Sequence, residues 1–112
     1  MKVVLNSIIP FPGFLAVTLW PFIFVRRSQE DRFTDAVWRH ELIHGRQQLE
    51  MLILPFLLWY FVEWLVRLIV LRDAKRAYRS ISFEQEAYAN EFDEHYLSTR
   101  RPYSWLKYLL SL

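Results

Sequence analysis

The first quarter of the chain has the apolar and β-branched pattern of strands. Residues 2–9 and 14–26 are rich in Val, Ile, Leu and Phe, and the segment 10–13 between them is a turn signal. Residues 14–26 are expected to form either one long strand or two short strands around Pro21. The pattern predicts a small antiparallel hairpin or sheet, with Pro21 at an edge or bulge because proline cannot donate to a ladder. The uncharged run 8–25 also suggests a membrane span, but three prolines and a glycine make a poor spanning helix.

The pattern becomes helical after a polar loop at 27–33. Thr34 or Asp35 is suited to the N-cap of a helix that runs to about Leu54. Pro55 then either kinks this helix or starts the next one.

Residues 52–71 form an apolar run of the length that spans a bilayer. Glu63 and Arg67 lie within it at i and i+4, where they can form an ion pair that lowers the cost of both charges. The run also carries aromatic residues suited to a membrane interface, namely Trp59, Tyr60 and Trp64. It therefore predicts either a membrane-associated helix or a buried core helix.

The last third of the chain predicts shorter helices. Residues 72–79 are basic, as is typical of the cytoplasmic flank of a membrane helix or of a solvated helix end. Ser82 and Gln85 fit a capping box that starts a helix ending near Leu97, and residues 103–112 predict a short amphipathic tail helix. The fold class is therefore α+β, a small N-terminal antiparallel hairpin or sheet followed by three to four helices in one domain, residues 1–112.

Composition narrows the classes of function. Hydrophobic residues make up 54% of the chain and aromatic residues 18%, more than a domain of 112 residues can bury, so a surface facing a membrane, a partner or a second copy is expected. The net charge is only +2 and no dense Lys/Arg stripe is present, which argues against nucleic-acid binding. With no cysteine, a metal would have to bind His and carboxylate groups.

The chemistry is concentrated in the HExxH pattern His40-Glu41-Leu42-Ile43-His44. On a helix, positions i and i+4 share one face, so both imidazoles can reach one metal ion, while Glu41 can act as a base toward water. The alternative is a surface helix with two unrelated histidines. Three His occur in the whole chain, and two of them flank this Glu, which favours a zinc site.

A catalytic zinc site needs a third protein ligand. No third His follows His44 closely, so a carboxylate from a later helix is expected. The candidates are Glu84, Glu86, Glu91 and Asp93, with His95 beyond them.

The segment Glu84-Gln85-Glu86-Ala87-Tyr88, after the HExxH pattern, resembles the Glu-x-x-Ala-Asp helix of gluzincin metallopeptidases. The resemblance is closest to the minigluzincins and the catalytic cores of integral-membrane gluzincins. It implies Zn²⁺ bound by His40, His44 and Glu84, with Glu41 as the general base. Tyr88 replaces the Asp that orients a ligating His in that family, and Glu91 or Asn90 could take its place.

The expected function is therefore that of a zinc-dependent metallopeptidase associated with a membrane and acting on a peptide or protein substrate. An extended peptide could pair with the strand near 19–25, and Tyr88, His95 or Tyr96 could stabilise the oxyanion. The alternative is a non-catalytic or latent membrane-associated binding module with a structural or vestigial metal site. Without membrane association the expected location is cytoplasmic, and a homo-oligomer is possible in either case.

Overall fold

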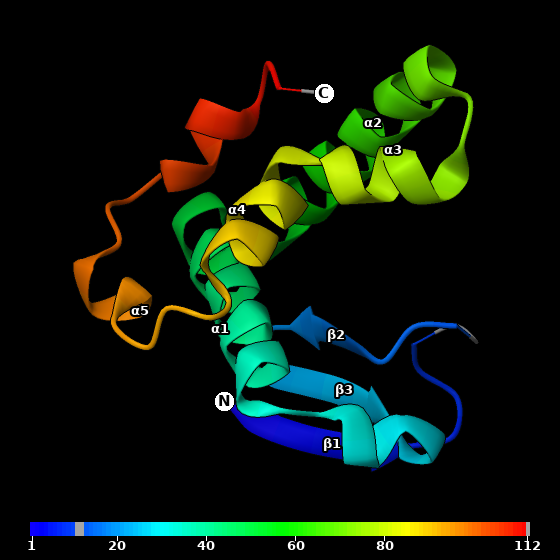
Figure 1. The fold of residues 1–112 in the computed structure, drawn as a ribbon, viewed down its shortest axis with the longest axis vertical. Helices are drawn as coiled ribbons and strands as arrows, with labels where there is room; N and C mark the ends of the chain where they lie inside the picture. Colours follow the sequence, from blue (N-terminus) through cyan, green and yellow to red (C-terminus); the bar gives the residue numbers. More distant parts are fainter. Residues whose placement is uncertain (11–12, 112) are drawn as a thin grey trace.

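The computed structural model describes residues 1–10 and 13–111 and has the expected α+β class, a three-stranded sheet followed by helices (Figure 1). The strands are β1 (Lys2–Asn6), β2 (Ala16–Leu19) and β3 (Phe22–Arg26). The α-helices are α1 (Asp35–Met51), α2 (Ile53–Leu71), α3 (Ala74–Ser80), α4 (Ser82–Asn90) and α5 (Tyr96–Thr99). Two 3-10 helices, η1 (Arg27–Arg32) and η2 (Ser104–Tyr108), complete the order.

The sheet is mixed, with strand order β1-β3-β2. β2 and β3 form an antiparallel hairpin whose turn contains Trp20 and Pro21, so proline lies outside the ladder. β1 pairs parallel with β3, and the prediction that the first strand joins an antiparallel sheet was wrong. The reason is that 14–26 folds back on itself, which makes β3 run in the same direction as β1.

Helix α1 starts where the sequence predicted. The Thr34 side chain accepts a hydrogen bond from the Val37 backbone N–H at 3.4 Å, which identifies Thr34 as the N-cap. The helix ends at Met51, three residues before the expected end, because Leu52 has a φ of 65°. Pro55 then falls in the first turn of α2, where its missing N–H is tolerated.

Helix α4 differs from the prediction at both ends. Its N-cap is Ile81, and Ser82 instead donates through its backbone N–H and its hydroxyl to the Glu63 carboxylate, at 2.6 and 2.7 Å. The helix ends at Asn90 rather than near Leu97, and turns and the short α5 follow. In place of the amphipathic helix expected over 103–112, the structure has the shorter 3-10 helix η2.

Helix α1 lies between the sheet and α4, as Figure 1 shows, with contacts to β2 on one side and to α4 on the other. Beside it, a buried cluster joins α2, α4 and η2 through Phe56, Ile81, Phe83 and Trp105. The HExxH residues therefore face the interior between two layers of the protein.

Helix α2 is long and apolar enough to cross a membrane. The buried residues of this helix are Phe56, Glu63 and Arg67, so α2 is not the enclosed core helix that the sequence allowed as an alternative. Glu63 and Arg67 form the expected ion pair, with Arg67 Nε 2.9 Å from Glu63 Oε2. Both side chains are buried on the protein side of the helix.

Candidate metal centre

The helical spacing of the HExxH pattern brings two imidazole nitrogens together on α1. His40 Nε2 and His44 Nε2 are 3.2 Å apart. Helix α4 contributes Glu84, whose Oε1 lies 3.0 Å from each of these nitrogens. All three residues are buried, and among the described residues they form one group of potential metal ligands.

The spacing of this triangle fits a tetrahedral metal ion. Nitrogen and oxygen ligands about 2.0–2.1 Å from zinc lie about 3.3 Å from one another. The three observed edges of 3.0, 3.0 and 3.2 Å are close to that value. The centre is therefore of the size that a small divalent cation requires.

The hydrogen bonds of Gln47 fix the tautomer of His44. The Gln47 amide nitrogen donates to the Glu86 carboxylate at 3.0 Å and to the Phe83 carbonyl at 3.1 Å, and both of these groups only accept. Gln47 Oε1 therefore faces His44 Nδ1, at 2.7 Å, and accepts its proton. In neutral His44, Nε2 then carries a lone pair directed at the Glu84 oxygen, an arrangement that needs a proton or a metal ion between them.

Electrostatics favour a proton or another cation between His44 and Glu84. Burial lowers the pKa of His44, but the adjacent Glu84 carboxylate outweighs it and raises the pKa to about 9. Burial raises the pKa of Glu84, but the two imidazoles, His44 foremost, hold it well below its usual range. The hydroxyl of Tyr60 donates to Glu84 Oε2 at 2.6 Å, which leaves Oε1 directed at the histidines.

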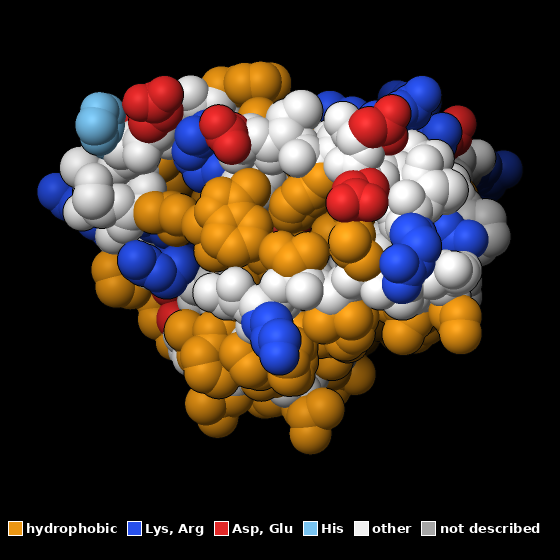
Figure 2. All heavy atoms as spheres, turned by 90° about the horizontal axis from the view of Figure 1, so that it is seen from below, with side chains coloured by type: hydrophobic (Ala, Val, Ile, Leu, Met, Phe, Trp, Pro, Cys, Tyr) orange, Lys and Arg blue, Asp and Glu red, His pale blue; other side chains and the backbone are white. Residues whose placement is uncertain are grey.

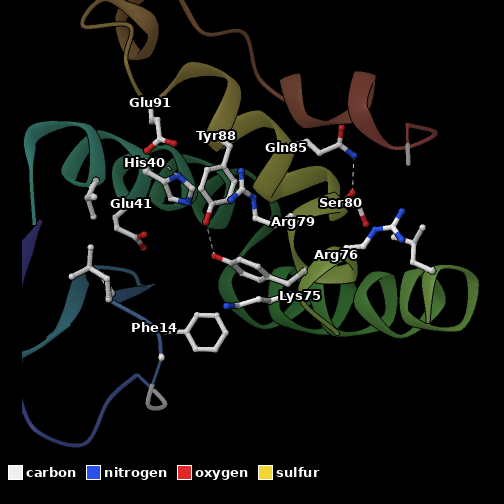
Figure 3. Close-up of a pocket in the computed structure, with 16 residues that line it drawn as sticks. Phe14, His40, Glu41, Lys75, Arg76, Arg79, Ser80, Gln85, Tyr88 and Glu91 are labelled. Carbon is white, nitrogen blue, oxygen red and sulfur yellow. Dashed lines mark hydrogen bonds and ion pairs between the residues drawn. The ribbon is translucent and has the colours of Figure 1, made fainter. Parts of the chain in front are cut away.

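His40 has different neighbours from His44. Its Nδ1 lies 3.8 Å from Glu91 Oε2, and its ring lies 4.4 Å from the Tyr88 ring in an edge-to-face arrangement. Figure 3 shows Glu91 directed toward this imidazole. Glu91 and Asn90 were the two candidates to replace the Asp of the gluzincin motif. Glu91 is the one that lies beside a histidine, whereas the Asn90 amide donates to the backbone carbonyl of Glu86.

The other predicted ligand candidates lie elsewhere. Glu86 is fully buried on the far side of Gln47, where it accepts hydrogen bonds from Tyr96, at 2.6 Å, and from Arg100. Burial raises its pKa, but these donors, Arg100 first, lower it below its usual value. Asp93 and His95 are exposed beyond the end of α4.

Glu41 lies beside the triangle, at the junction of two cavities. Its Oε1 accepts a hydrogen bond from the Thr18 hydroxyl of β2 at 2.7 Å. One cavity, of about 750 Å³, is lined by polar side chains that include His40, Arg79 and Glu91 (Figure 3). The other, of about 530 Å³, is mostly apolar and reaches His44 and Glu84 from the side of α2.

Three residues that surround the triangle, Gln47, Thr18 and Tyr60, were not predicted as part of the site, and Tyr60 was expected at a membrane interface instead. Gln47 was detectable in principle, because it follows His44 by three positions and so shares its helical face. Thr18 and Tyr60 gave no such signal, since β2 and α2 reach the centre only through the tertiary fold.

Comparison with known proteins adds no assignment to this geometry. No protein family, curated protein or solved structure matches the chain. A function for the centre must therefore be argued from the residues that form it.

Proposed function

We propose that the protein is a zinc-dependent peptidase of the gluzincin type that acts at a membrane. The observation that carries the proposal is the triangle of His40 Nε2, His44 Nε2 and Glu84 Oε1, in which Gln47 binds Nδ1 of His44 and so directs Nε2 inward. These three atoms would hold Zn²⁺. When bound, zinc supplies Lewis-acid activation of a water molecule and of the substrate carbonyl.

Glu41 is the proposed general base. Its carboxylate takes a proton from the attacking water and gives it to the nitrogen of the leaving amine when the peptide bond breaks. The Thr18 hydroxyl donates to Oε1, which fixes the carboxylate and leaves Oε2 for the water. The location of Glu41 between two cavities supports this role, because a chain that crosses from one cavity to the other passes over it.

An extended peptide is the substrate shape that the sheet favours. β2 is an edge strand, and Gln48 bonds the Thr18 carbonyl and the Trp20 N–H on the edge away from β3. Ala16 faces the same edge by alternation and lines both cavities. Strand pairing is therefore proposed for β2 near Ala16 rather than for β3, which is the central strand.

Two tyrosines are candidates for a hydrogen-bond donor to the substrate carbonyl. The hydroxyls of Tyr78 and Tyr88 lie 3.2 Å apart, and both side chains line the polar cavity. Tyr96, by contrast, is bonded to Glu86, and His95 is exposed past α4. Tyr78 or Tyr88 is therefore the proposed donor to the oxyanion.

The geometry of the candidate centre supports a catalytic zinc site rather than a structural one. A structural zinc site is closed by four protein ligands, whereas a catalytic site keeps one position for water. The group formed by the described residues has three members, and cavities approach it from two sides. The C-terminal η2 packs against α4 and, in the described part of the chain, lines neither of these cavities, which argues against a latent site blocked by the tail.

Membrane association is the second part of the proposal. Hydrophobic side chains gather over the lower part of the surface in Figure 2, while most charged side chains lie above them. α2 supplies many of the exposed hydrophobic residues of the chain, with Leu54 77% and Ile69 74% exposed. A contiguous apolar surface of this kind is typical of contact with a membrane.

The test of the proposed activity compares Glu41→Gln with the wild type in detergent, with zinc present and an unstructured protein as substrate. Wild type should cleave it, and Glu41→Gln should lose about 10²–10⁴-fold in rate while it keeps its zinc. The matched control is Glu94→Gln, an exposed residue after α4, which should keep full activity. Full activity in Glu41→Gln would contradict the role of Glu41.

A further inference from the structure

The polarity of α2 is inverted relative to a helix on the surface of a soluble protein. Its buried positions include the ion pair Glu63 and Arg67, and its half-buried positions include Tyr60 and Trp64. Eleven of its 19 residues are exposed, and all eleven are hydrophobic. They are Leu54, Pro55, Leu57, Leu58, Trp59, Phe61, Val62, Leu65, Val66, Ile69 and Val70. Such a helix places its polar groups against the protein and its apolar groups outside.

A lipid bilayer is the environment that fits this exposed face. The exposed residues occupy more than half of the helix surface, more than a single flat protein partner would cover. Apolar grooves continue on both flanks of the helix, one beside Phe61 and one beside Val66. Acyl chains can fill such an irregular apolar surface without specific shape complementarity.

The position of α3 argues against an upright orientation of α2 across the bilayer. After Leu71 the chain turns back, and α3 runs alongside α2 (Figure 1), where the Trp64 indole N–H donates to the Ala74 carbonyl at 3.3 Å. The segment 72–79 has four basic residues and one acidic residue, and Lys75 and Arg76 are exposed. If α2 stood upright, these charges would enter the hydrocarbon region, where they are costly.

We propose that α2 lies in the plane of the membrane, immersed in one leaflet, with the basic residues of 72–79 at the level of anionic lipid headgroups. The helix is about 28 Å long at 1.5 Å per residue, but in this orientation its length lies along the leaflet. Polar α3 and α4 then remain on the aqueous side. The inference deepens the proposed membrane association and is independent of whether the centre hydrolyses peptides.

This orientation also places the apolar cavity at the membrane surface. Leu57 and Phe61 belong to the exposed face of α2 and line the cavity that reaches His44. Phe14, which is 39% exposed, lines the same cavity from the β1–β2 connection. An apolar segment in the leaflet would therefore have a direct path to the metal centre.

Depth measurements on α2 distinguish the two orientations. The chain has no cysteine, so single spin-labelled cysteines can be placed at the exposed positions Leu54, Leu58, Val62, Leu65 and Ile69 of the full-length protein in vesicles of phosphatidylcholine and phosphatidylglycerol. An in-plane helix gives similar oxygen accessibility and similar depth at all five sites. A profile that is shallow at Leu54 and Ile69 and deepest at Val62 would show a spanning helix and overturn the proposal.

The sidedness of the flanking segments provides a second readout. Glu30 precedes α2 in the sequence and Lys75 follows it, and both positions are exposed, so each can be replaced by a single cysteine. In the reconstituted protein, an impermeant maleimide should label both from the same side of the vesicle. Labelling from opposite sides would require a spanning helix and would contradict the in-plane orientation.

Vesicle flotation tests the membrane contact itself. Leu58→Glu and Ile69→Glu should each reduce binding to vesicles about tenfold or more, whereas Phe92→Glu, an equally exposed hydrophobic position after α4, should not. Wild type should bind vesicles with phosphatidylglycerol more tightly than pure phosphatidylcholine, and Glu41→Gln should bind as wild type does. Unchanged binding in both α2 variants would overturn the proposal, and circular dichroism in detergent verifies that they are folded. Hydrolysis is not part of this readout, so its absence would affect only the proposed function.

Discussion

Gln47 accepts a hydrogen bond from Nδ1 of His44 at 2.7 Å, and the two residues are three positions apart on α1. Gln47 is itself oriented by the Glu86 carboxylate, which Arg100 and Tyr96 bind from the opposite side. The tautomer of neutral His44 is thus set by a chain of contacts that extends to the C-terminal part of the protein. The arrangement links the candidate metal centre to residues far from it in sequence.

Loss of the Gln47 side-chain oxygen should weaken zinc binding. Gln47→Leu keeps a side chain of similar size but removes the group that holds the proton on Nδ1, and a loss of this kind costs about 10–100-fold in metal affinity. The measurement is zinc competition with a chromophoric chelator in detergent. Gln48→Leu is the matched control, because Gln48 is an equally buried amide that bonds β2 and no histidine. Equal zinc affinity in Gln47→Leu and wild type would contradict the role of Gln47.

Thr18 should affect hydrolysis without affecting the metal. Its hydroxyl donates to Glu41 Oε1 at 2.7 Å, and Thr18→Val replaces it with a methyl group of nearly the same shape. We expect kcat to fall about 10–100-fold, since a hydrogen bond to a charged group contributes about 1.5–3 kcal/mol, with zinc stoichiometry unchanged. Thr18→Ser, which retains the hydroxyl, should restore most of the activity. A kcat in Thr18→Val equal to that of Thr18→Ser would show that this hydrogen bond does not support the reaction.

The Glu63 carboxylate should be important for stability. It accepts hydrogen bonds from Trp59, Arg67 and both the backbone and side chain of Ser82. Glu63→Ala leaves the buried Arg67 without its counter-ion, which typically costs about 3–5 kcal/mol. Because Ser82 begins the helix that carries Glu84, zinc affinity should fall as well.

The free energy of unfolding in denaturant, in mild detergent, measures this effect. The double variant Glu63→Leu/Arg67→Leu is the control. It removes the unpaired charge of Arg67 but still leaves the Ser82 donors without an acceptor, so it should be destabilised less than Glu63→Ala. A destabilisation below about 1 kcal/mol in Glu63→Ala would show that the carboxylate does not fix the α2–α4 contact.

The zinc-free protein should lose stability as pH rises above neutrality. The folded-state pKa of His44 is about 9, above the reference value of 6.5, so its contribution is complete below pH 6.5 and disappears as pH rises through about 9. The pKa of Glu84 is lowered from 4.5, so its contribution is present above pH 4.5 and is lost as pH falls below that value. The pKa shifts of His44 and Glu84 arise from the same interaction between these two residues. This interaction contributes on the order of 3 kcal/mol to the stability of the folded protein.

Thermal unfolding of chelator-treated protein between pH 5 and pH 10 provides the measurement. The melting temperature should fall between about pH 6.5 and 9, and the fall should be much smaller in His44→Asn, which cannot be protonated. A wild-type profile that is as flat as that of His44→Asn would contradict the interaction between His44 and Glu84.

Local patterns accounted for much of the fold. Thr34 was one of the two residues predicted as the cap, with Asp35, and the i, i+4 spacing correctly predicted the ion pair of Glu63 with Arg67. Both features depend on residues within about one helical turn. The pairing of β1 with β3 was not predictable in the same way, since strand direction depends on where the intervening chain turns. Ser82 is the first residue of α4 rather than its cap, and its backbone N–H and hydroxyl are directed at Glu63, 19 positions earlier, a contact that no local pattern shows.

In the candidate site, too, local spacing predicted some features while others depend on tertiary packing. The spacing of His40 and His44 was sufficient to place both imidazoles on one face, because a helix determines that geometry. The sequence left Glu84, Glu86 and Glu91 as alternatives, and the structure brings Glu84 to both Nε2 atoms. The position of Tyr60 against Glu84 follows only from the packing of α2 on α4, for which no local pattern exists.

The central claim is that His40, His44 and Glu84 bind one zinc ion, and zinc stoichiometry of the purified protein at neutral pH tests it most directly. The account predicts one zinc per chain in wild type, none after His44→Ala, a large loss of affinity after Glu84→Ala, and retention in Glu91→Gln. Atomic absorption on dialysed, detergent-solubilised samples measures the number of zinc ions per chain. A wild-type protein that binds no zinc, or a His44→Ala variant that retains a full equivalent, would contradict the account.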